Sequence, residues 1–266
     1  MPISRFVLII GVMILIPFEV SLTVIMLTFF ITAILEFSLL FYSLVKIELT
    51  KFRIEFKIKV LRRILLFSIP MGLSVFFVGV YDRIDIILIQ KIISTEAVSF
   101  YAIAYSLYKI PSIVIPIILT PLFTDLSSEF ELNKKLHLSK LKGISLLLFV
   151  FAVFSIIIIY FFADTIIEFT YGAKYLSSTN LLMLLVFALP LLFLNNLTGV
   201  TLNSIKKERF TFYSTLIGAV ANIIINLIFL TTIGLKGAAI ATIVSEFLVL
   251  LLQLNYLLKF QVLLVK

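Results

Sequence analysis

Long apolar runs joined by short polar links form the main pattern of this chain. Eight such runs can be distinguished, at residues 6–16, 20–45, 65–90, 98–123, 144–163, 181–202, 210–231 and 238–258. All but the first are long enough for a helix to cross a bilayer, which takes about 20 residues. None shows the alternation of polar and apolar positions that marks a transmembrane β-strand. We therefore predict an all-α fold, a polytopic membrane helix bundle with about eight transmembrane segments.

The basic residues indicate the side of the membrane on which each link lies. Most of the 22 lysines and arginines fall at the ends of the chain and in alternate links, whereas the other links contain only Lys91, Lys174 and Lys236. Because short loops rich in Lys and Arg stay in the cytoplasm, we predict a cytoplasmic-membrane protein with both termini in the cytoplasm. The most basic link includes residues 52–60, whose period-two pattern fits either an interfacial connector on anionic headgroups or a solvated basic loop.

Composition removes several classes of function. The chain is 62% hydrophobic and 14% charged, whereas soluble domains carry roughly 25% charged residues. We therefore expect membrane lipids as its surroundings, and the net charge of +8 does not indicate a nucleic-acid partner. The sequence lacks cysteine and any GxxxxGK[ST] phosphate-binding run, and its one histidine, His137, falls in the polar link 124–142. We expect His137 to be a solvated loop residue, and we predict no enzymatic activity, catalytic residue, metal site or cofactor.

Charged residues inside the apolar runs are the first candidate site residues. Asp82, Arg83 and Asp85 lie in the outer third of the run 65–90. A charge in hydrocarbon costs at least about 2.5 to 3.5 kcal/mol on insertion scales, so such residues usually face a bundle interior or a wet cavity. The three residues mark either a functional site or an ion pair that stays hydrated near the membrane surface. Asp85 lies roughly 7 to 8 Å from the outer end of its helix, which favours the hydrated outer mouth.

Lys109 lies deeper, about midway along the run 98–123. If the two runs form an antiparallel hairpin, the long lysine stem can reach Asp82 or Asp85. Lys109 is either a partner for anionic headgroups such as a diphosphate or one half of a structural ion pair, and it is the better candidate for substrate contact. The candidate substrate-binding set is therefore Lys109, Asp85, Asp82 and Arg83.

Other polar residues and prolines in the runs predict bending, packing and ion coupling. A bent or broken helix is expected at the prolines of the run 98–123, because each removes an amide donor and disturbs the preceding turn. These prolines are Pro111, Pro116 and Pro121. Gly218, Asn222 and Asn226 share one helical face, which favours close packing and interhelical hydrogen bonds over solute contact. Glu246 is the candidate coupling-ion residue if protons or sodium drive transport.

Several short motifs resemble one family of membrane proteins. The sequences TYGAKYLSSTNLLMLL and GAVANIIINLIFLTTIGLKGAAIATIVSEF are similar to the C-terminal part of polysaccharide-biosynthesis flippases of the O-antigen type. These belong to the multidrug/oligosaccharidyl-lipid/polysaccharide exporter superfamily. The matching positions are Tyr171, Gly172, Tyr175, Asn222, Asn226, Gly234, Gly237, Ala238 and Ala239, with Pro70 and the Asp85 to Tyr101–Ala102 spacing upstream. Ser99 stands where the family usually has glycine, and the link NSIKKER lacks a glycine that commonly precedes its basic residue.

The resemblance implies an architecture and an activity. Such proteins carry two lobes of six helices around a central cavity and flip lipid-linked oligosaccharides by alternating access. On this pattern residues 64–260 would be a six-helix second lobe, and residues 1–63 the last two helices of an incomplete first lobe plus a basic cytoplasmic linker. Residues 261–266 would be a short cytoplasmic tail. The partner would be an isoprenoid-linked glycan, together with a missing N-terminal half or a second subunit.

Three functions remain open from the sequence. The resemblance favours flipping of lipid-linked oligosaccharide or polysaccharide precursors by what we expect to be a partial chain. A cation-coupled drug exporter of the same superfamily is an alternative. A non-transporting membrane scaffold in a glycan-assembly complex is another.

Overall fold

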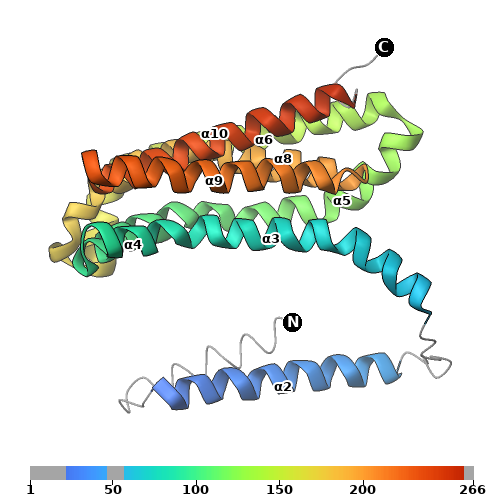
Figure 1. The fold of residues 1–266 in the computed structure, drawn as a ribbon, viewed down its shortest axis with the longest axis horizontal. Coiled ribbons are helices and arrows are strands. Elements are labelled where there is room, and N and C mark those ends of the chain that lie inside the picture. The colour runs from blue at the N-terminus through green and yellow to red at the C-terminus, as the bar shows by residue number, and fades with distance from the viewer. Residues whose placement is uncertain (1–21, 47–56, 261–266) are drawn as a thin grey trace. The chain divides into compact units, whose positions relative to one another are not determined.

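The computed structural model describes residues 22–46 and 57–260, and every regular element in these two ranges is a helix (Figure 1). The first apolar run, residues 52–56 of the basic link and the tail 261–266 lie outside the described residues. The chain divides into two compact units, Met1–Leu61 and Arg62–Lys266, which are described separately. In the first unit the structure describes α2 (Leu22–Lys46) and the first turn of α3, and α2 coincides with the predicted run 20–45.

The second unit contains the remaining predicted runs, each as one helix or as a series of helical pieces. These elements are α3 (Ile58–Ile92), α4 (Thr95–Lys109), η3 (Ile110–Ile113), α5 (Val114–Leu132), α6 (Lys134–Tyr171), η4 (Ala173–Ser178), α7 (Thr179–Leu185), η5 (Val186–Ala188), α8 (Leu189–Ser204), α9 (Glu208–Ile233) and α10 (Leu235–Lys259). Six stretches of the described chain are long and apolar enough to cross a membrane: Met26–Ser43, Thr95–Phe130, Lys134–Tyr171, Ala173–Ser204, Glu208–Ile233 and Leu235–Lys259. The predicted fold class, an all-α polytopic membrane bundle, is confirmed. Of the eight predicted spans, the first lies outside the described residues, and the run 65–90, which forms most of α3, is not among these six stretches.

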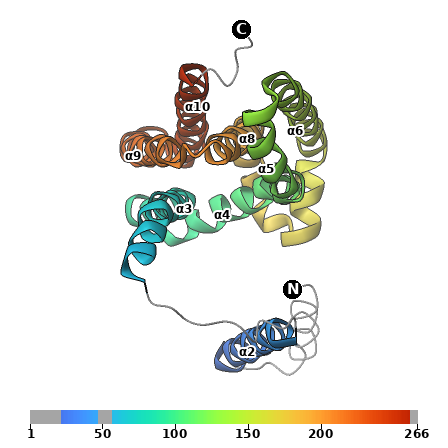
Figure 2. The same cartoon turned by 90° about the vertical axis from the view of Figure 1, so that its right-hand side faces the viewer.

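Helix α8 is the central helix of the second unit. It packs against α5, α6, α9 and α10, as the end-on view shows (Figure 2). Its buried side chains include Phe193 and Leu202, which are fully covered. In contrast, the backbone of α3 comes close to its neighbours at few points among the described residues. Side chains therefore make most of the contacts that hold α3 against the unit.

Close approach of α9 and α10 depends on two glycines. A Cβ atom on Gly218 would lie 2.4 Å from the Cγ2 atom of Val249, and one on Gly237 would lie 2.5 Å from the backbone of Phe229. Small residues allow membrane helices to pack closely where no hydrophobic force between helices is available. The predicted packing role of the face that carries Gly218 is thus confirmed.

Two membrane-spanning stretches are interrupted by short 3₁₀ turns. The turn η3 lies between α4 and α5, and Pro111 is its second residue. The predicted break is therefore confirmed there. Pro121 lies inside α5, which continues through it. The second break, η5 before α8, was not predicted, although Pro190 follows it at the start of α8. Mid-helix 3₁₀ turns often mark hinges or strain.

The polar link expected at residues 124–142 is almost entirely helical. Helix α5 continues to Leu132, and Asn133 alone separates it from α6, whose first turn it caps by accepting a hydrogen bond from the Leu136 amide (3.1 Å). The 38 residues of α6 span about 57 Å at the helical rise, well beyond the roughly 30 Å hydrocarbon core. Polar residues here therefore lie on helix ends that leave the hydrocarbon.

His137 is consequently a correction to the expectation of a solvated loop residue. Its side chain is 1% exposed and lies edge-on to the ring of Phe130, with 5.4 Å between the ring centroids. The polar sequence around it did not reveal that one face of α6 packs against α5. Among the described residues no group of three or more His, Asp or Glu side chains is placed to hold a metal ion.

Candidate functional site

A cavity of about 300 Å³ lies within the second unit between α3, α8, α9 and α10, with the end of α4 at its edge. Apolar side chains form part of its wall, but several polar ones face it. These are Ser74, Tyr81, Asp82, Lys109, Asn195, Asn196, Asn203, Thr215, Glu246 and Gln253. Because α8, α9 and α10 belong to stretches that are long and apolar enough to cross a membrane, this cavity places polar groups and charges where lipid would not accept them.

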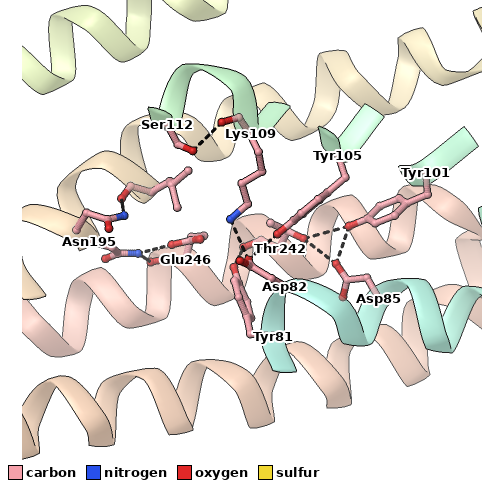
Figure 3. A network of polar contacts seen from close by, with 12 residues as sticks. Tyr81, Asp82, Asp85, Tyr101, Tyr105, Lys109, Ser112, Asn195, Thr242 and Glu246 are labelled. Carbon is pink, nitrogen blue, oxygen red and sulfur yellow. Dashed lines mark hydrogen bonds and ion pairs between the residues drawn. The ribbon is translucent and has the colours of Figure 1, made fainter. Parts of the chain in front are cut away.

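Lys109 and Asp82 form an ion pair at the edge of this cavity (Figure 3). The Lys109 Nζ atom lies 2.9 Å from the Asp82 Oδ1 atom, which also accepts a hydrogen bond from the Tyr105 hydroxyl at 2.7 Å. The two charged side chains keep 26% and 31% of their surface exposed. One of the two pairings expected from the sequence is thus confirmed, between α3 and α4. Tyr105 was not predicted, although its position four residues before Lys109 places both on one face of α4.

The position of Lys109 follows from the break that comes after it. Helix α4 ends at Lys109, and the hydroxyl of Ser112 in η3 donates to the Lys109 carbonyl at 2.6 Å. The ammonium also lies 5.3 Å from the centre of the Tyr105 ring and 5.8 Å from that of Tyr108. Lys109 is therefore a cation that aromatic rings and one carboxylate hold in place at a helix end.

Asp85 occupies a different environment from Asp82. Its carboxylate accepts hydrogen bonds from the Tyr101 hydroxyl (2.6 Å), the Asn226 amide (2.7 Å) and the Thr242 hydroxyl (3.2 Å). The side chain is 2% exposed, and it does not line the cavity. Counting residues from the end of α3 had suggested a hydrated outer mouth, and the structure corrects this because α4, α9 and α10 all cover the carboxylate. The node formed by Asp85, Tyr101, Asn226 and Thr242, which joins four helices, is called the Asp85 node below.

Arg83 separates from both carboxylates. It is exposed on α3, lies outside the cavity wall and has no ion-pair partner among the described residues. The three adjacent charges of the sequence thus fall into three environments: a part-exposed ion pair, a buried node and an exposed face.

Glu246 faces the same cavity as Lys109. Its side chain is 5% exposed, and the Asn195 amide donates to its carboxylate at 2.5 Å and to its backbone carbonyl at 2.8 Å. This contact joins α8 to α10 (Figure 3). The structure brings three of the predicted site residues, Lys109, Asp82 and Glu246, to one cavity.

Hydrogen bonds connect α8 to α9 through Gln253 of the cavity wall. The Thr198 hydroxyl donates to the Gln253 side chain, whose amide donates to the Ser214 hydroxyl at 3.1 Å. Gln253 lies seven residues after Glu246, so the two share a face of α10. That spacing was the sequence signal for Gln253, and it was missed because glutamine carries no charge.

These features define a class of protein: an all-α, multi-pass membrane protein whose spanning helices enclose a polar cavity with charged walls. Residues 4–180 match the family model described as polysaccharide biosynthesis protein, and this match covers more than half of the chain. The chain belongs to this family. The resemblance found in the sequence is thereby confirmed.

Individual relatives agree with this assignment. The chain is 23% identical over 184 residues to "Probable low-salt glycan biosynthesis flippase Agl15" of Haloferax volcanii, a match that covers 68% of this chain and 38% of that protein. It is 30% identical over 101 residues to "Uncharacterized membrane protein MJ1068" of Methanocaldococcus jannaschii, covering 38% of this chain and 20% of that protein. The chain thus spans well under half of the length of these curated relatives.

One solved structure has a similar fold. The structure described as "Lipid II flippase MurJ, inward closed conformation" aligns with a TM-score of 0.66 and 21% sequence identity. The alignment covers 98% of this chain and 57% of that one. At this identity the likeness establishes the fold.

Proposed function

We propose that this chain forms part of a transporter that flips lipid-linked oligosaccharide or polysaccharide precursors across the cytoplasmic membrane. The observation that carries the proposal is the polar cavity among membrane-spanning helices, with the cation Lys109 at its edge. Membership in the polysaccharide biosynthesis family and the flippases among its relatives support the substrate class.

In this proposal Lys109 binds the diphosphate of an isoprenoid-linked glycan. An ammonium group has three donors and acts as a point charge toward phosphate, and one of those donors is directed at Asp82 in this structure. The incoming diphosphate takes over the donor now directed at Asp82. Substrate binding thereby loosens a contact between α3 and α4, and the Tyr105 hydroxyl remains as a hydrogen-bond donor to Asp82.

Glu246 provides a means of coupling. With both acids ionised, the cavity wall carries two carboxylates, Asp82 and Glu246, against the single ammonium of Lys109. An anionic substrate meets less repulsion when Glu246 holds a proton or a monovalent cation. Binding of the coupling ion and of the substrate then favour each other, as linkage requires of two sites with a positive coupling free energy.

The breaks in the spanning stretches support alternating access. The 3₁₀ turn η3 directly follows Lys109, and η5 precedes α8, which forms one wall of the cavity. Discontinuous helices are common where transporters bind and move their solutes. A second lobe, supplied by another part of a longer protein or by a second subunit, closes the other side of the pathway. In this arrangement both termini lie in the cytoplasm.

A drug exporter is the second candidate, and one observation favours it. The excess of carboxylates over ammonium groups in the cavity suits a lipophilic cation as well as it suits a coupling ion. The two candidates differ in the residue they require. Glycan flipping needs Lys109, whereas cation export needs Asp82 or Glu246 and gains from removal of Lys109.

Proteoliposomes that contain the full chain, alone or with a co-expressed partner half, test the proposal with a fluorescent lipid-diphosphate-linked oligosaccharide. We expect flipping, and we expect Lys109→Gln to lower its initial rate by about tenfold or more, because a charge-assisted contact to phosphate is lost. Lys174→Gln removes the same charge outside the cavity and is the matched control. Unchanged flipping by Lys109→Gln excludes the proposed site. Export of a lipophilic cation without glycan flipping favours the exporter, and no transport of either favours a scaffold.

A further inference from the structure

A second hollow lies between α6 and α10 on the opposite face of α8 from the cavity. This α6–α10 groove has a volume of about 270 Å³, and both of its flanking helices pack on α8 (Figure 2). The α8 residues that line it are Leu194, Leu197, Thr198 and Thr201, whereas Asn195, Asn196, Gly199 and Asn203 line the cavity. At about 100° of rotation per residue these two sets point in opposite directions. Helix α8 therefore separates the groove from the cavity.

The walls of the α6–α10 groove suit hydrocarbon. Leucines from all three helices make up most of its lining, with Leu138, Leu197 and Leu257 among them. The hydroxyls in its wall already donate their protons within the protein: Ser145 to the carbonyl of Lys142 (2.9 Å), Thr198 to Gln253, and Thr201 to the carbonyl of Leu197 (2.8 Å). An apolar hollow left empty forfeits dispersion contacts along its whole lining, and in a bilayer an acyl chain is the material at hand.

Among the described residues, Lys142 is the one charged side chain that lines the groove. It has no ion-pair partner among the described residues, whereas Lys140, two residues earlier, pairs with Asp125 (2.9 Å) and Glu129. Lys142 lies eight residues into α6, about 12 Å along the helix from its first residue. A lysine stem can carry its ammonium toward the interface from that depth. The groove thus combines an apolar channel with one uncompensated cation near a helix end.

We propose that the α6–α10 groove binds one anionic glycerophospholipid, with an acyl chain against the leucines and the headgroup phosphate on Lys142. A phosphate supplies the counter-charge that Lys142 lacks, and a neutral apolar ligand would leave it unpaired. The isoprenoid tail of a substrate in the cavity is separated from this groove by α8. This lipid site does not depend on the proposed transport function.

A hydrogen bond also connects the wall of the groove to the wall of the cavity. Thr198 lines the groove and donates to Gln253, which lines the cavity. A lipid in the groove therefore packs against a side chain that is directly bonded to the cavity wall.

Native mass spectrometry of the purified full chain tests the site, with phosphatidylglycerol and phosphatidylcholine of identical chains as the probes. We expect one phosphatidylglycerol to bind more tightly than phosphatidylcholine. Lys142→Ala should weaken phosphatidylglycerol about tenfold and phosphatidylcholine by clearly less, because the choline ammonium already offsets the phosphate charge in phosphatidylcholine. Leu194→Phe should remove both lipids by filling the groove.

Matched variants keep the test decisive. Lys236→Ala removes one charge at the start of α10, away from the groove, and Leu146→Phe adds the same bulk on an exposed face of α6. Equal losses of phosphatidylglycerol in Lys142→Ala and Lys236→Ala overturn the site, as does full lipid binding by Leu194→Phe. If Leu194→Phe does not fold, the comparison of the two lysine variants decides alone. Displacement of phosphatidylglycerol by a lower concentration of a polyprenyl phosphate also overturns the assignment, because the groove would then belong to an isoprenoid.

Discussion

Asp85 and Tyr101 are sixteen residues apart in the sequence, and the Tyr101 hydroxyl donates to the Asp85 carboxylate at 2.6 Å. This contact fastens α3 to α4, the two arms of a helical hairpin. The same carboxylate binds Asn226 of α9 and Thr242 of α10. Since the α3 backbone comes close to its neighbours at few points in the described chain, the side-chain hydrogen bonds of the Asp85 node are an important buried attachment of α3 to the rest of the second unit.

Removal of the Asp85 carboxylate should therefore destabilise the unit. We expect Asp85→Ala to cost about 3 kcal/mol, because the buried Tyr101 hydroxyl loses its carboxylate acceptor and Asn226 and Thr242 each lose one of their acceptors. Tyr101→Phe should cost about 1 to 2 kcal/mol. Thermal unfolding in detergent measures both. In a double-mutant cycle that combines Tyr101→Phe with Asp85→Asn, the two losses of stability should not add. Arg83→Ala is the matched control on the exposed side of α3, and an Asp85→Ala variant as stable as this control would contradict the role of the node.

The glycines of the α9–α10 contact should differ in their tolerance of alanine. A Cβ on Gly237 meets the backbone of Phe229, which cannot rotate away, whereas a Cβ on Gly218 meets the end of the Val249 side chain. We expect Gly237→Ala to cost about 1 to 3 kcal/mol, as overpacking does. Gly218→Ala should cost less, and Val249→Ala should recover part of the loss. A Cβ on Gly143 of α6 would have no neighbouring atom within 4 Å, so Gly143→Ala should raise the free energy of unfolding by up to about 1 kcal/mol. Equal effects of alanine at Gly143 and Gly237 would refute this account.

Lys206 adopts a backbone conformation that glycine prefers. It has a φ of 61° in the turn between α8 and α9, and left-handed backbone costs a non-glycine residue about 1 to 2 kcal/mol. This is the link in which the family resemblance led us to expect a glycine. Lys206→Gly should raise the stability by about 0.5 to 1 kcal/mol, less than the full strain because glycine gains freedom in the unfolded chain. Lys207→Gly, at a φ of −116°, should not stabilise, and thermal unfolding of the two variants distinguishes them.

Much of the fold was predictable because the bilayer imposes length and polarity on each span. Every predicted run from 20–45 onward coincides with described helix, and Pro111 correctly predicted the break before α5. The division into lobes and the cytoplasmic termini stay predictions. Helix ends were less predictable, since α6 continues through polar residues that a reading of hydropathy assigns to a loop.

The charged residues of the site could be predicted from the sequence, whereas most of the neutral residues that bind them could not. Lys109, Asp82 and Glu246 stood out because a charge inside an apolar run is costly. Tyr105 and Thr242 did not, since a hydroxyl in a helix costs little when it finds a partner, and that partner comes from another helix. For the same reason the burial of Asp85 could not be deduced from its depth along α3 alone.

Charge exchange in the Lys109–Asp82 pair can distinguish a structural role of the pair from a role of Lys109 in substrate binding. Lys109→Asp and Asp82→Lys each place two like charges side by side, and each should lower stability by up to about 1 kcal/mol, a small effect because the pair is part-exposed. The double exchange restores an ion pair between α3 and α4 and should recover wild-type thermal stability. It also moves the cation from the end of α4 to α3, away from the turn η3. We therefore expect the exchanged protein to unfold like the wild type and to flip a labelled lipid-diphosphate-linked oligosaccharide at a rate close to that of Lys109→Gln. Full flipping by the exchanged protein would show that the pair acts only as a structural contact.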